Sequence, residues 1–316
     1  MARLTKLNLK GGLVNNSGQN LVGAGELFTT GKVWYVDSVN GSDGNLGDDP
    51  NFPKATLDSA VTAAVANRGD VIVLMPNHAQ NIANATTFQL DKAGLTVIGL
   101  GDGRNRPTFS FTNTAGSVEL DSADCRISNI VFVADVSAVV VGVNVDASDV
   151  TIDNCEFNFN DSGDDFIDFI VVDGVRRTNL IDNVFIAQEN VIALGASRTA
   201  IYLNNVDELV IQGNLFTGGY TSAVIGDPLG APGGGESDNL FIIGNVINND
   251  APNTTALAID INSTASGMIA NNRIFMVGGH TTDAGFLDPG SCGTAENYAT
   301  TAVDRSGHLA PVSTQN

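Results

Sequence analysis

The sequence predicts an all-β fold in which short strands stack coil upon coil into a solenoid. A phrase with an Asn between two short apolar strands recurs along the second half of the chain, at Asn129, Asn154, Asn183, Asn214, Asn245 and Asn272. Subtracting successive Asn numbers gives spacings of 25, 29, 31, 31 and 27 residues. A unit of nearly fixed length with small insertions is the pattern of a solenoid. Charged residues make up only 16% of the chain, a composition that suits short strands and tight turns better than helices.

The repeated Asn is expected where the chain bends between two strands. One coil cannot bury its own apolar side chains, whereas stacked coils pair through backbone hydrogen bonds about 4.8 Å apart. Asn tolerates the left-handed backbone of such a bend, and its amide can bond to the Asn of the next coil. We therefore expect the six Asn to form one column, a structural ladder. Flanking apolar residues such as Ile152 and Ile243 are expected to point into the core.

The repeat divides the chain into three parts: an N-terminal arm (1–31), a solenoid (32–278) and a C-terminal tail without the repeat (279–316). Within the solenoid, residues 54–67 place apolar side chains at helical spacing, which predicts a short amphipathic helix. A helix at this point would cap the open end of the apolar core, where an uncovered sheet edge invites aggregation. The tail is expected to cover the far end or to contact a neighbour.

The N-terminal arm is the one basic segment of an acidic chain. It carries Arg3, Lys6 and Lys10 between the apolar residues Leu4, Leu7 and Leu9. Opposite charge and the ability to add a strand to a neighbouring sheet both favour protein binding. We predict that these six residues bind a partner. A disordered terminus and an arm that folds back over the first coil are the alternatives.

Charge and cysteine usage exclude several classes of partner. The formal net charge is −20, so we predict neither a nucleic-acid nor an anionic-membrane partner, since both require clustered Lys and Arg. No secretory signal and no apolar run of about 18 residues is visible, which favours assembly in the cytoplasm. Cys125, Cys155 and Cys292 occupy unrelated places in the repeat, so a disulfide framework is not expected.

The candidate for chemistry is an acidic stretch with Asp161, Asp164, Asp165, Asp168 and Asp173, followed by Arg176 and Arg177. Carboxylate oxygens suit calcium, and a pair of carboxylates can hydrolyse a glycosidic bond. The same residues also make an ordinary polar turn on a solvated face, and this interpretation is favoured. No catalytic residue, metal or cofactor is therefore assigned.

The remaining residue types add little chemistry. His78, His280 and His308 lie far apart without the spacing of zinc ligands. The Gly-rich segment 99–103 precedes a strand and not a helix, so a turn is expected and not a phosphate loop. Trp34 is expected to be buried, whereas Tyr202 and Tyr220 could line a groove for a glycan.

The N-terminal part of the chain resembles a known superfamily. The motifs are YVD at 35–37, NGSDG at 40–44, PKATLDSAV at 53–61, GDVIVLMP at 69–76 and LTVIGLG at 95–101. Together they resemble the start of the pectate-lyase-like right-handed parallel β-helix superfamily, and the resemblance covers about 32–278. It implies a right-handed parallel β-helix. In lyases of this superfamily carboxylates hold calcium and an Arg removes a proton, but no such motif matches here residue by residue.

The resemblance leaves three functions open, because the superfamily includes lyases, hydrolases, epimerases and phage virion proteins. The first hypothesis is a structural virion protein of a tailed bacteriophage, a capsid decoration protein or short spike on the virion surface. As implied by phage relatives, it would be a homotrimer bound to the major capsid protein or another virion protein. The second is a tailspike-like enzyme that degrades a polysaccharide, and the third is a passive adhesin that binds a host glycan.

Overall fold

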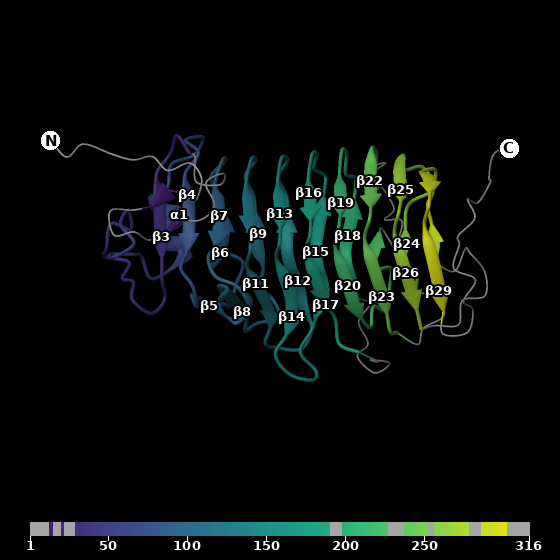
Figure 1. The fold of residues 1–316 in the computed structure, drawn as a ribbon, viewed down its shortest axis with the longest axis horizontal. Coiled ribbons are helices and arrows are strands. Elements are labelled where there is room, and N and C mark those ends of the chain that lie inside the picture. The colour runs from purple at the N-terminus through teal and green to yellow at the C-terminus, as the bar shows by residue number, and fades with distance from the viewer. Residues whose placement is uncertain are drawn as a thin grey trace.

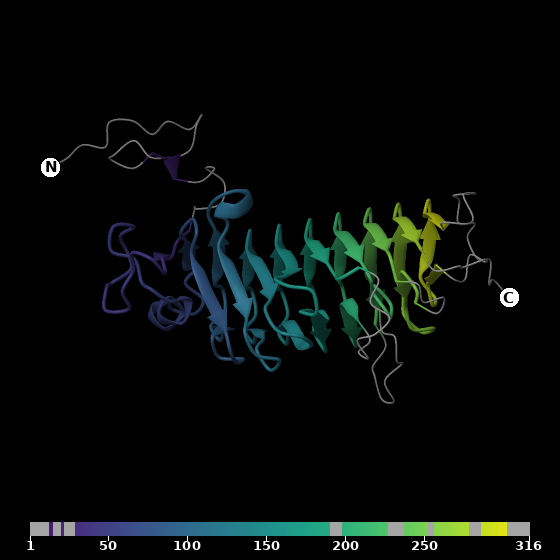
Figure 2. The ribbon, with the colours of Figure 1, turned by 90° about the horizontal axis from the view of Figure 1, so that it is seen from below.

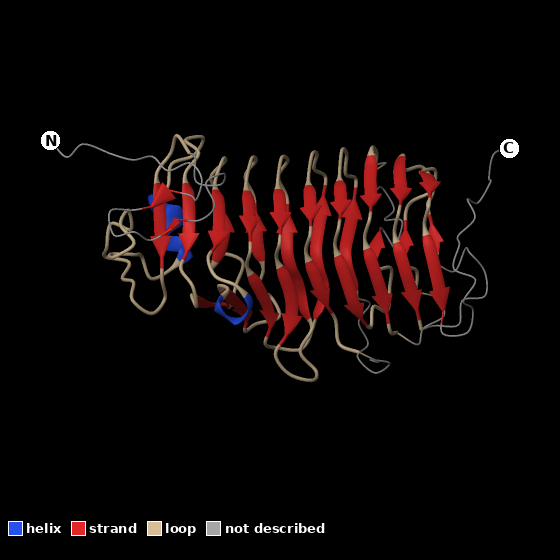
Figure 3. Cartoon of the chain, viewed as in Figure 1, coloured by secondary structure: helices blue, strands red, loops and turns tan. Residues whose placement is uncertain are grey.

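The computed structural model describes residues 13–14, 20–21, 29–189, 198–226, 237–251, 256–277 and 286–301. It confirms the predicted all-β, right-handed parallel solenoid. The coils follow one another along a single long axis, from the N-terminal end to the C-terminal end (Figures 1 and 2). Strands make up nearly all the regular structure (Figure 3). The short strands β1 (Leu13–Val14) and β2 (Asn20–Leu21) form a separate antiparallel pair.

Three parallel sheets run the length of the solenoid, and each full coil gives one strand to each sheet. Sheet 1 contains β3 (Val33–Val36), β4 (Val71–Leu74), β7 (Thr96–Gly99), β10 (Arg126–Ser128), β13 (Thr151–Asp153), β16 (Asn179–Ile181), β19 (Val210–Gln212), β22 (Leu240–Ile243), β25 (Gly267–Ala270) and β28 (Gly293–Ala295). Sheet 2 contains β5 (Ala79–Ile82), β8 (Thr108–Phe111), β11 (Val131–Ala134), β14 (Glu156–Phe159), β17 (Val184–Ile186), β20 (Leu215–Gly218), β23 (Val246–Asn249), β26 (Arg273–Met276) and β29 (Tyr298–Thr301).

Sheet 3 contains β6 (Phe88–Leu90), β9 (Val118–Leu120), β12 (Val139–Val145), β15 (Phe166–Asp173), β18 (Thr199–Asn204), β21 (Ile225–Gly226), β24 (Ile259–Asp260) and β27 (Leu287–Asp288). Sheets 1 and 2 meet at a two-residue bend in most coils, whereas longer loops lead from sheet 2 to sheet 3. The Gly-rich segment 99–103 is a turn, as expected, and leads through a short 3-10 helix, η1 (Gly103–Asn105), to β8.

The core is built from rows of like side chains, one from each coil. Parallel register places the inward residue of each sheet 1 strand above that of the preceding one, so that Ile127, Ile152 and Leu180 stack without solvent exposure. Sheet 2 contributes a row of phenylalanines. The rings of Phe157 and Phe185 are 5.0 Å apart between centroids and nearly parallel. Such rows bury apolar area that no single coil could bury.

An Asn ladder lies at the bend between sheets 1 and 2. It runs through four predicted members and one that lies in the predicted tail: Asn183, Asn214, Asn245, Asn272 and Asn297. All five are buried. In each link the side-chain amide and the backbone N–H of one Asn donate to Oδ1 of the next. Each amide also donates to a backbone carbonyl of the preceding coil, for example Asn214 to Leu180 at 2.9 Å.

The assignment of Asn129 and Asn154 to this ladder is wrong by one position. The strand register aligns Ile130 and Cys155 with the ladder column, and it aligns Asn129 and Asn154 with Asp182 in the neighbouring column. That neighbouring column holds the left-handed backbone, with φ of 59° at Asn129 and 52° at Asn154. The left-handed residue and the ladder residue are therefore adjacent positions, which the sequence analysis had merged into one.

The same shift reverses the assignment of Ile243. Its neighbour Ile242 points into the core, and Ile243 pairs with Gln212 and Ala270 on the outer face. Because side chains alternate along a strand, a shift of one residue moves a side chain to the opposite face. Ile152 points inward, as expected.

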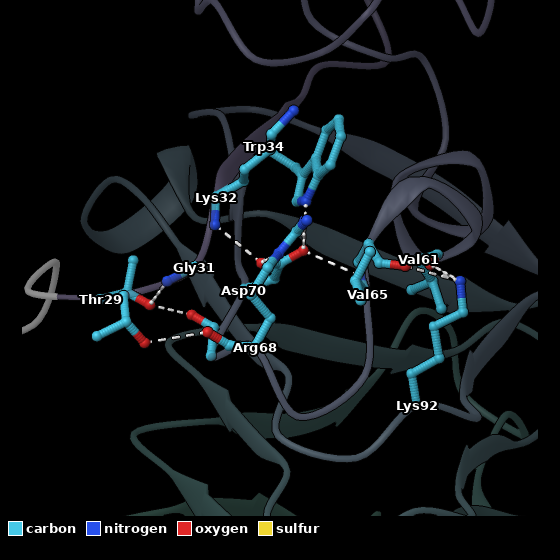
Figure 4. Close-up of polar contacts among 12 residues, drawn as sticks. Thr29, Gly31, Lys32, Trp34, Val61, Val65, Arg68, Asp70 and Lys92 are labelled. Carbon is cyan, nitrogen blue, oxygen red and sulfur yellow. Dashed lines mark hydrogen bonds and ion pairs between the residues drawn. The ribbon is translucent and has the colours of Figure 1, made fainter.

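The predicted helix is present but shorter. Helix α1 (Leu57–Ala63) contacts β3, β4 and β6, at the N-terminal end of sheets 1 and 3. Thr56 caps its N-terminus by accepting from the backbone N–H of Ser59. At the C-terminus Lys92 donates to carbonyl oxygens of the last turn, including Val61 at 2.7 Å (Figure 4). A cation in this place satisfies carbonyls that have no partner within the helix.

A buried carboxylate, Asp70, ties the first coil together (Figure 4). It accepts from the backbone N–H of Lys32 at 2.8 Å and from the indole of Trp34 at 3.0 Å, and it forms an ion pair with Arg68. Burial alone would raise the pKa of Asp70, but these donors hold it far below its usual range. Trp34 is buried, as expected, and its indole N–H has found a partner.

The solenoid extends beyond the predicted boundary at residue 278. Strands β27, β28 and β29 add one further strand to each of the three sheets. Asn297 continues the ladder in this coil. The expected non-repeating tail (279–316) therefore contains a further coil within 286–301.

Candidate functional site

The outer face of sheet 3 carries most of the carboxylates on the three sheet faces. Register aligns Glu119 on β9 with Asn144 on β12, and Asp260 on β24 with Asp288 on β27, along one outward row. Asp168 on β15 points outward in another row, beside Thr199. A row of like charges on stacked strands is held at strand spacing, so the field on this face is strongly negative.

Three of these acids converge at the N-terminal end of sheet 3. Single ligand oxygens of Glu119, Asp121 and Asp146 all lie within 4.8 Å of one another. Asn144 lies between them and donates its amide to Glu119 at 3.1 Å and to Asp146 at 2.8 Å. Carboxylate oxygens of this kind suit a hard cation such as calcium, but the amide of Asn144 already compensates part of their charge.

The protonation of this group follows from its surroundings. Burial raises the pKa of Glu119, although the Ser117 hydroxyl and the Asn144 amide donate to its carboxylate. Burial also raises the pKa of Asp146, and the charges of Asp121 and Asp173 raise it further. Like charges in adjacent coils therefore oppose full ionisation of the row.

A hollow lies beside these acids. It has a volume of about 320 Å³ and is lined by Thr114, Gly116, Ser117, Glu119, Val141 and Asn144. Its walls offer hydroxyl, carboxylate and amide groups next to apolar surface. This set of groups can accept and donate hydrogen bonds to a polyhydroxylated ligand.

The predicted acidic stretch does not form one site. Asp161 and Asp164 lie in the loop before β15, where their backbone carbonyls accept from the Gln188 amide at 2.9 and 2.7 Å. Asp165 is buried, Asp168 lies on the outer face of sheet 3, and Asp173 accepts from Asn204 at 2.8 Å.

The two arginines that follow also act separately. Arg176 pairs with Asp207 at 2.9 Å, and Arg177 pairs with Asp149 at 2.5 Å. Each pair joins one coil to the next and leaves the arginine on the surface. The favoured interpretation of the stretch, ordinary polar surface, agrees with these places for all its acids except Asp165.

Asp165 forms a buried ion pair that the sequence analysis did not anticipate. Its carboxylate lies 2.5 Å from Nε of Arg198, and both side chains are nearly inaccessible to solvent. Desolvation raises the pKa of Asp165 to about 6, although the Arg198 charge and the backbone N–H of Phe166 oppose the shift. A buried pair of this kind costs desolvation on both sides. Removing either partner would leave an uncompensated buried charge.

The aromatic and histidine residues do not build a glycan cleft. Tyr220 is fully buried and donates its hydroxyl to the Phe185 carbonyl at 3.1 Å, so the expectation that it could line a groove is wrong. Tyr202 is half-buried on β18. His78 is buried, its Nδ1 accepts from the backbone N–H of Ser38, and burial lowers its pKa to about 4. His280 lies outside the described residues, as does His308.

Two further groups of predicted residues remain to be placed. The partner-binding residues of the arm, Arg3, Leu4, Lys6, Leu7, Leu9 and Lys10, lie outside the described residues. The three cysteines are free and buried, with no disulfide between them. Burial raises the pKa of the Cys155 thiol to about 12 and that of Cys292 to about 11. No helix in the described part of the chain is long and apolar enough to cross a membrane.

The converging acids were missed, but the sequence held a signal for them. Asp121 and Asp146 are 25 residues apart, the same spacing as Asn129 and Asn154. Residues separated by one coil length stack, so equal spacing predicts contact between adjacent coils. No comparable signal marks Arg198, which reaches Asp165 through loops of unequal length.

Comparison with known proteins finds structural likeness only. No family model matches the chain, and no curated protein matches it. Pectate lyase Pel9A is 16% identical with a TM-score of 0.48, covering 87% of this chain and 78% of the lyase. A rhamnogalacturonan lyase is 13% identical (TM-score 0.40; 78% and 69% covered). ORF18 of Geobacillus virus E2 is 12% identical (TM-score 0.38), with 78% of this chain and 58% of the viral chain covered. Likeness at these identities concerns the fold alone.

Proposed function

We propose that this chain is a structural component of a tailed-bacteriophage particle, a rigid shaft on the virion surface that decorates the capsid. The observation that carries the proposal is the way ionic side chains brace the shaft. Arg126 pairs with Asp153 of the next coil through two contacts of 2.7 and 2.9 Å. Arg106 reaches Glu156 on β14 at 3.0 Å, spanning the intervening strand β11.

These braces favour a mechanical role over a catalytic one. A single exposed ion pair contributes little to stability, but several that join successive coils act as a network. The Asn ladder adds hydrogen bonds between the same coils inside the core. The acidic groups used in this way are committed to arginines, and a shaft needs such cross-links more than it needs a cleft.

The particle itself is inferred from the resemblance of the N-terminal motifs. That combination of a YVD strand, an NGSDG turn and a helix is commonest in bacterial and phage surface proteins. Attachment is assigned to the N-terminal arm, where Arg3, Lys6 and Lys10 would meet an acidic surface of the major capsid protein or another virion protein. Opposite charges would guide the encounter.

Charge reversal of the arm tests this attachment. Particles lacking the protein are incubated with wild type and with a variant carrying Arg3→Glu, Lys6→Glu and Lys10→Glu, and bound protein is quantified after sedimentation. We expect the reversed arm to lose binding at least tenfold. The matched control keeps the charge, with Arg3→Lys, Lys6→Arg and Lys10→Arg, and should bind like wild type. Equal binding of all three proteins would contradict the proposed attachment.

A second function, binding or cleavage of a polysaccharide, is favoured by the hollow beside Glu119. Its hydroxyl, carboxylate and amide groups suit a glycan. A panel of capsular and lipopolysaccharide glycans tests it by affinity and by release of oligosaccharides. Glu119→Gln should abolish either signal, whereas Glu296→Gln, at a distant exposed bend, should not. A signal that survives Glu119→Gln would exclude this hollow as the site.

A further inference from the structure

Two of the three outer faces of the solenoid are almost free of charge. On the ten strands of sheet 1, the only outward residues with formal charge are Arg126 and Asp153, which neutralise each other. On sheet 2 the outward charged residues are Glu156, which pairs with Arg106, and Arg273. A chain with a net charge of −20 therefore keeps its acid off two of its three sheet faces.

The same two faces expose large apolar side chains toward the C-terminal end. On sheet 1, Phe241 and Met268 are register neighbours and are 43% and 44% exposed. On sheet 2, Leu215 and Val246 are register neighbours, and Tyr298 follows two coils beyond Val246 with 49% exposure. These residues flank the bend that contains the Asn ladder. We call Leu215, Phe241, Val246, Met268, Phe275 and Tyr298 the apolar corner.

A contiguous apolar surface beside uncharged strands marks a protein interface. We propose that the apolar corner is an interface between copies of this chain, packed side by side with parallel axes. Charge selects a second copy. Two molecules that each carry −20 repel wherever carboxylates meet, and they can approach closely only on faces without net charge. A basic partner would instead be drawn to sheet 3.

The pitch of the solenoid also fits a second copy. Strands in both molecules are spaced by about 4.8 Å, so rows of side chains on one copy stay in step with rows on the other over many coils. A partner of another fold would match such a surface over a few residues only.

Arg273 indicates how the copies are arranged. It lies in the apolar corner, between Val246 and Tyr298 in its row, and no carboxylate of the described residues pairs with it. Asp288 lies one sheet further along the same coil, exposed on sheet 3. With parallel axes, Arg273 of one copy is level with Asp288 of the next. A contact between two different surfaces is heterologous, and the smallest closed ring that it can form contains three copies.

The mass of the full-length protein in solution tests this interface. Light scattering after gel filtration should give a trimer for wild type and a monomer for Phe241→Asp with Met268→Asp. Val140→Asp, on the exposed outer face of sheet 3, is the matched control and should remain trimeric. Circular dichroism melting checks that each variant folds. If the Asp pair lowers the melting temperature, Phe241→Gln with Met268→Gln replaces it.

A charge swap tests the arrangement of the ring. Arg273→Asp should reduce the mass to that of a monomer, and adding Asp288→Arg should restore the trimer. A monomeric wild type, or a corner variant that keeps the wild-type mass, would overturn the interface. Failure of Asp288→Arg to restore the trimer would overturn the head-to-tail ring. Neither result depends on attachment to a particle, so the proposed virion role is tested separately.

Discussion

The side chain of Asn214 donates to Oδ1 of Asn245 at 3.0 Å, and the backbone N–H of Asn214 donates to the same oxygen at 3.0 Å. One side-chain oxygen thus satisfies two donors of the preceding coil at a bend where neither strand can supply an acceptor. The buried bend of one coil is completed by the Asn of the next. The ladder is therefore a condition for burying these bends, since unsatisfied backbone groups there would be costly.

Asn214→Ala should destabilise the protein by on the order of 3 kcal/mol, because the backbone N–H of Asn183 and the carbonyl of Leu180 would each lose a buried partner at about 1–3 kcal/mol. These partners lie at 2.9 Å in both cases. Urea unfolding followed by circular dichroism measures the loss. Asn154→Gly is the matched control at the neighbouring left-handed column, where glycine fits without strain, and it should change stability by less than about 0.5 kcal/mol. Equal effects of the two changes would contradict the division into two columns.

A charge placed on either side of one strand type should have opposite consequences. Ile152→Asp puts a carboxylate into the dry core and should prevent folding. Ile243→Asp places it on the outer face of sheet 1 and should leave a folded chain, with impaired self-association since it borders the apolar corner. Soluble expression and circular dichroism distinguish the two. A folded Ile152→Asp protein, or an unfolded Ile243→Asp protein, would contradict the register described above.

The sequence was sufficient for the architecture because the repeat records it directly. Spacings of 25 to 31 residues predicted stacked coils, and apolar periodicity predicted the helix that became α1. Register at the bend was harder. Asn suits both a left-handed backbone and a ladder, so Asn129 and Asn154 could not be separated from Asn183 by residue type alone.

The candidate site was less predictable, because it depends on which residues the coils bring together. Consecutive acids such as Asp164 and Asp165 looked like one group, yet one lies in a loop and the other is buried against Arg198. Glu119 and Asp146 are far apart in sequence and converge through register. A search at one coil spacing finds the second kind of group, whereas a search for local clusters finds the first.

The three thiols should be unreactive in the folded protein. Cys125 and Cys155 are about 1% exposed, and Cys292 is 8% exposed. Burial raises the pKa of all three, to about 12 for Cys155, so little thiolate forms at pH 8. Labelling with Ellman's reagent should release no thiolate within minutes from native protein and three equivalents per chain in guanidinium. Val140→Cys, on an exposed position, should react at once, and rapid labelling of the wild type would show that these coils open.

Asp168 should make stability depend on pH in a predictable direction. Desolvation raises its pKa to about 6, although Thr199 donates a hydrogen bond to it, whereas in the unfolded chain an Asp titrates near about 3.9. Because the folded pKa is the higher one, the charged form is penalised in the folded state at every pH above about 6. As pH falls through 6 toward 4 the folded protein takes up the proton and the penalty disappears.

Asp168→Asn removes this penalty and should stabilise the protein at pH 7.5. Two pKa units correspond to at most about 3 kcal/mol, and partial exposure of the side chain lowers the expected gain to about 1–2 kcal/mol. Chemical unfolding at pH 7.5 and at pH 4 measures it in both proteins. The variant and wild type should differ at pH 7.5 and converge at pH 4. The raised pKa of Asp165 is common to both proteins and cancels in the difference, so a gain that persists at pH 4 would mean that packing, and not the charge of Asp168, is responsible.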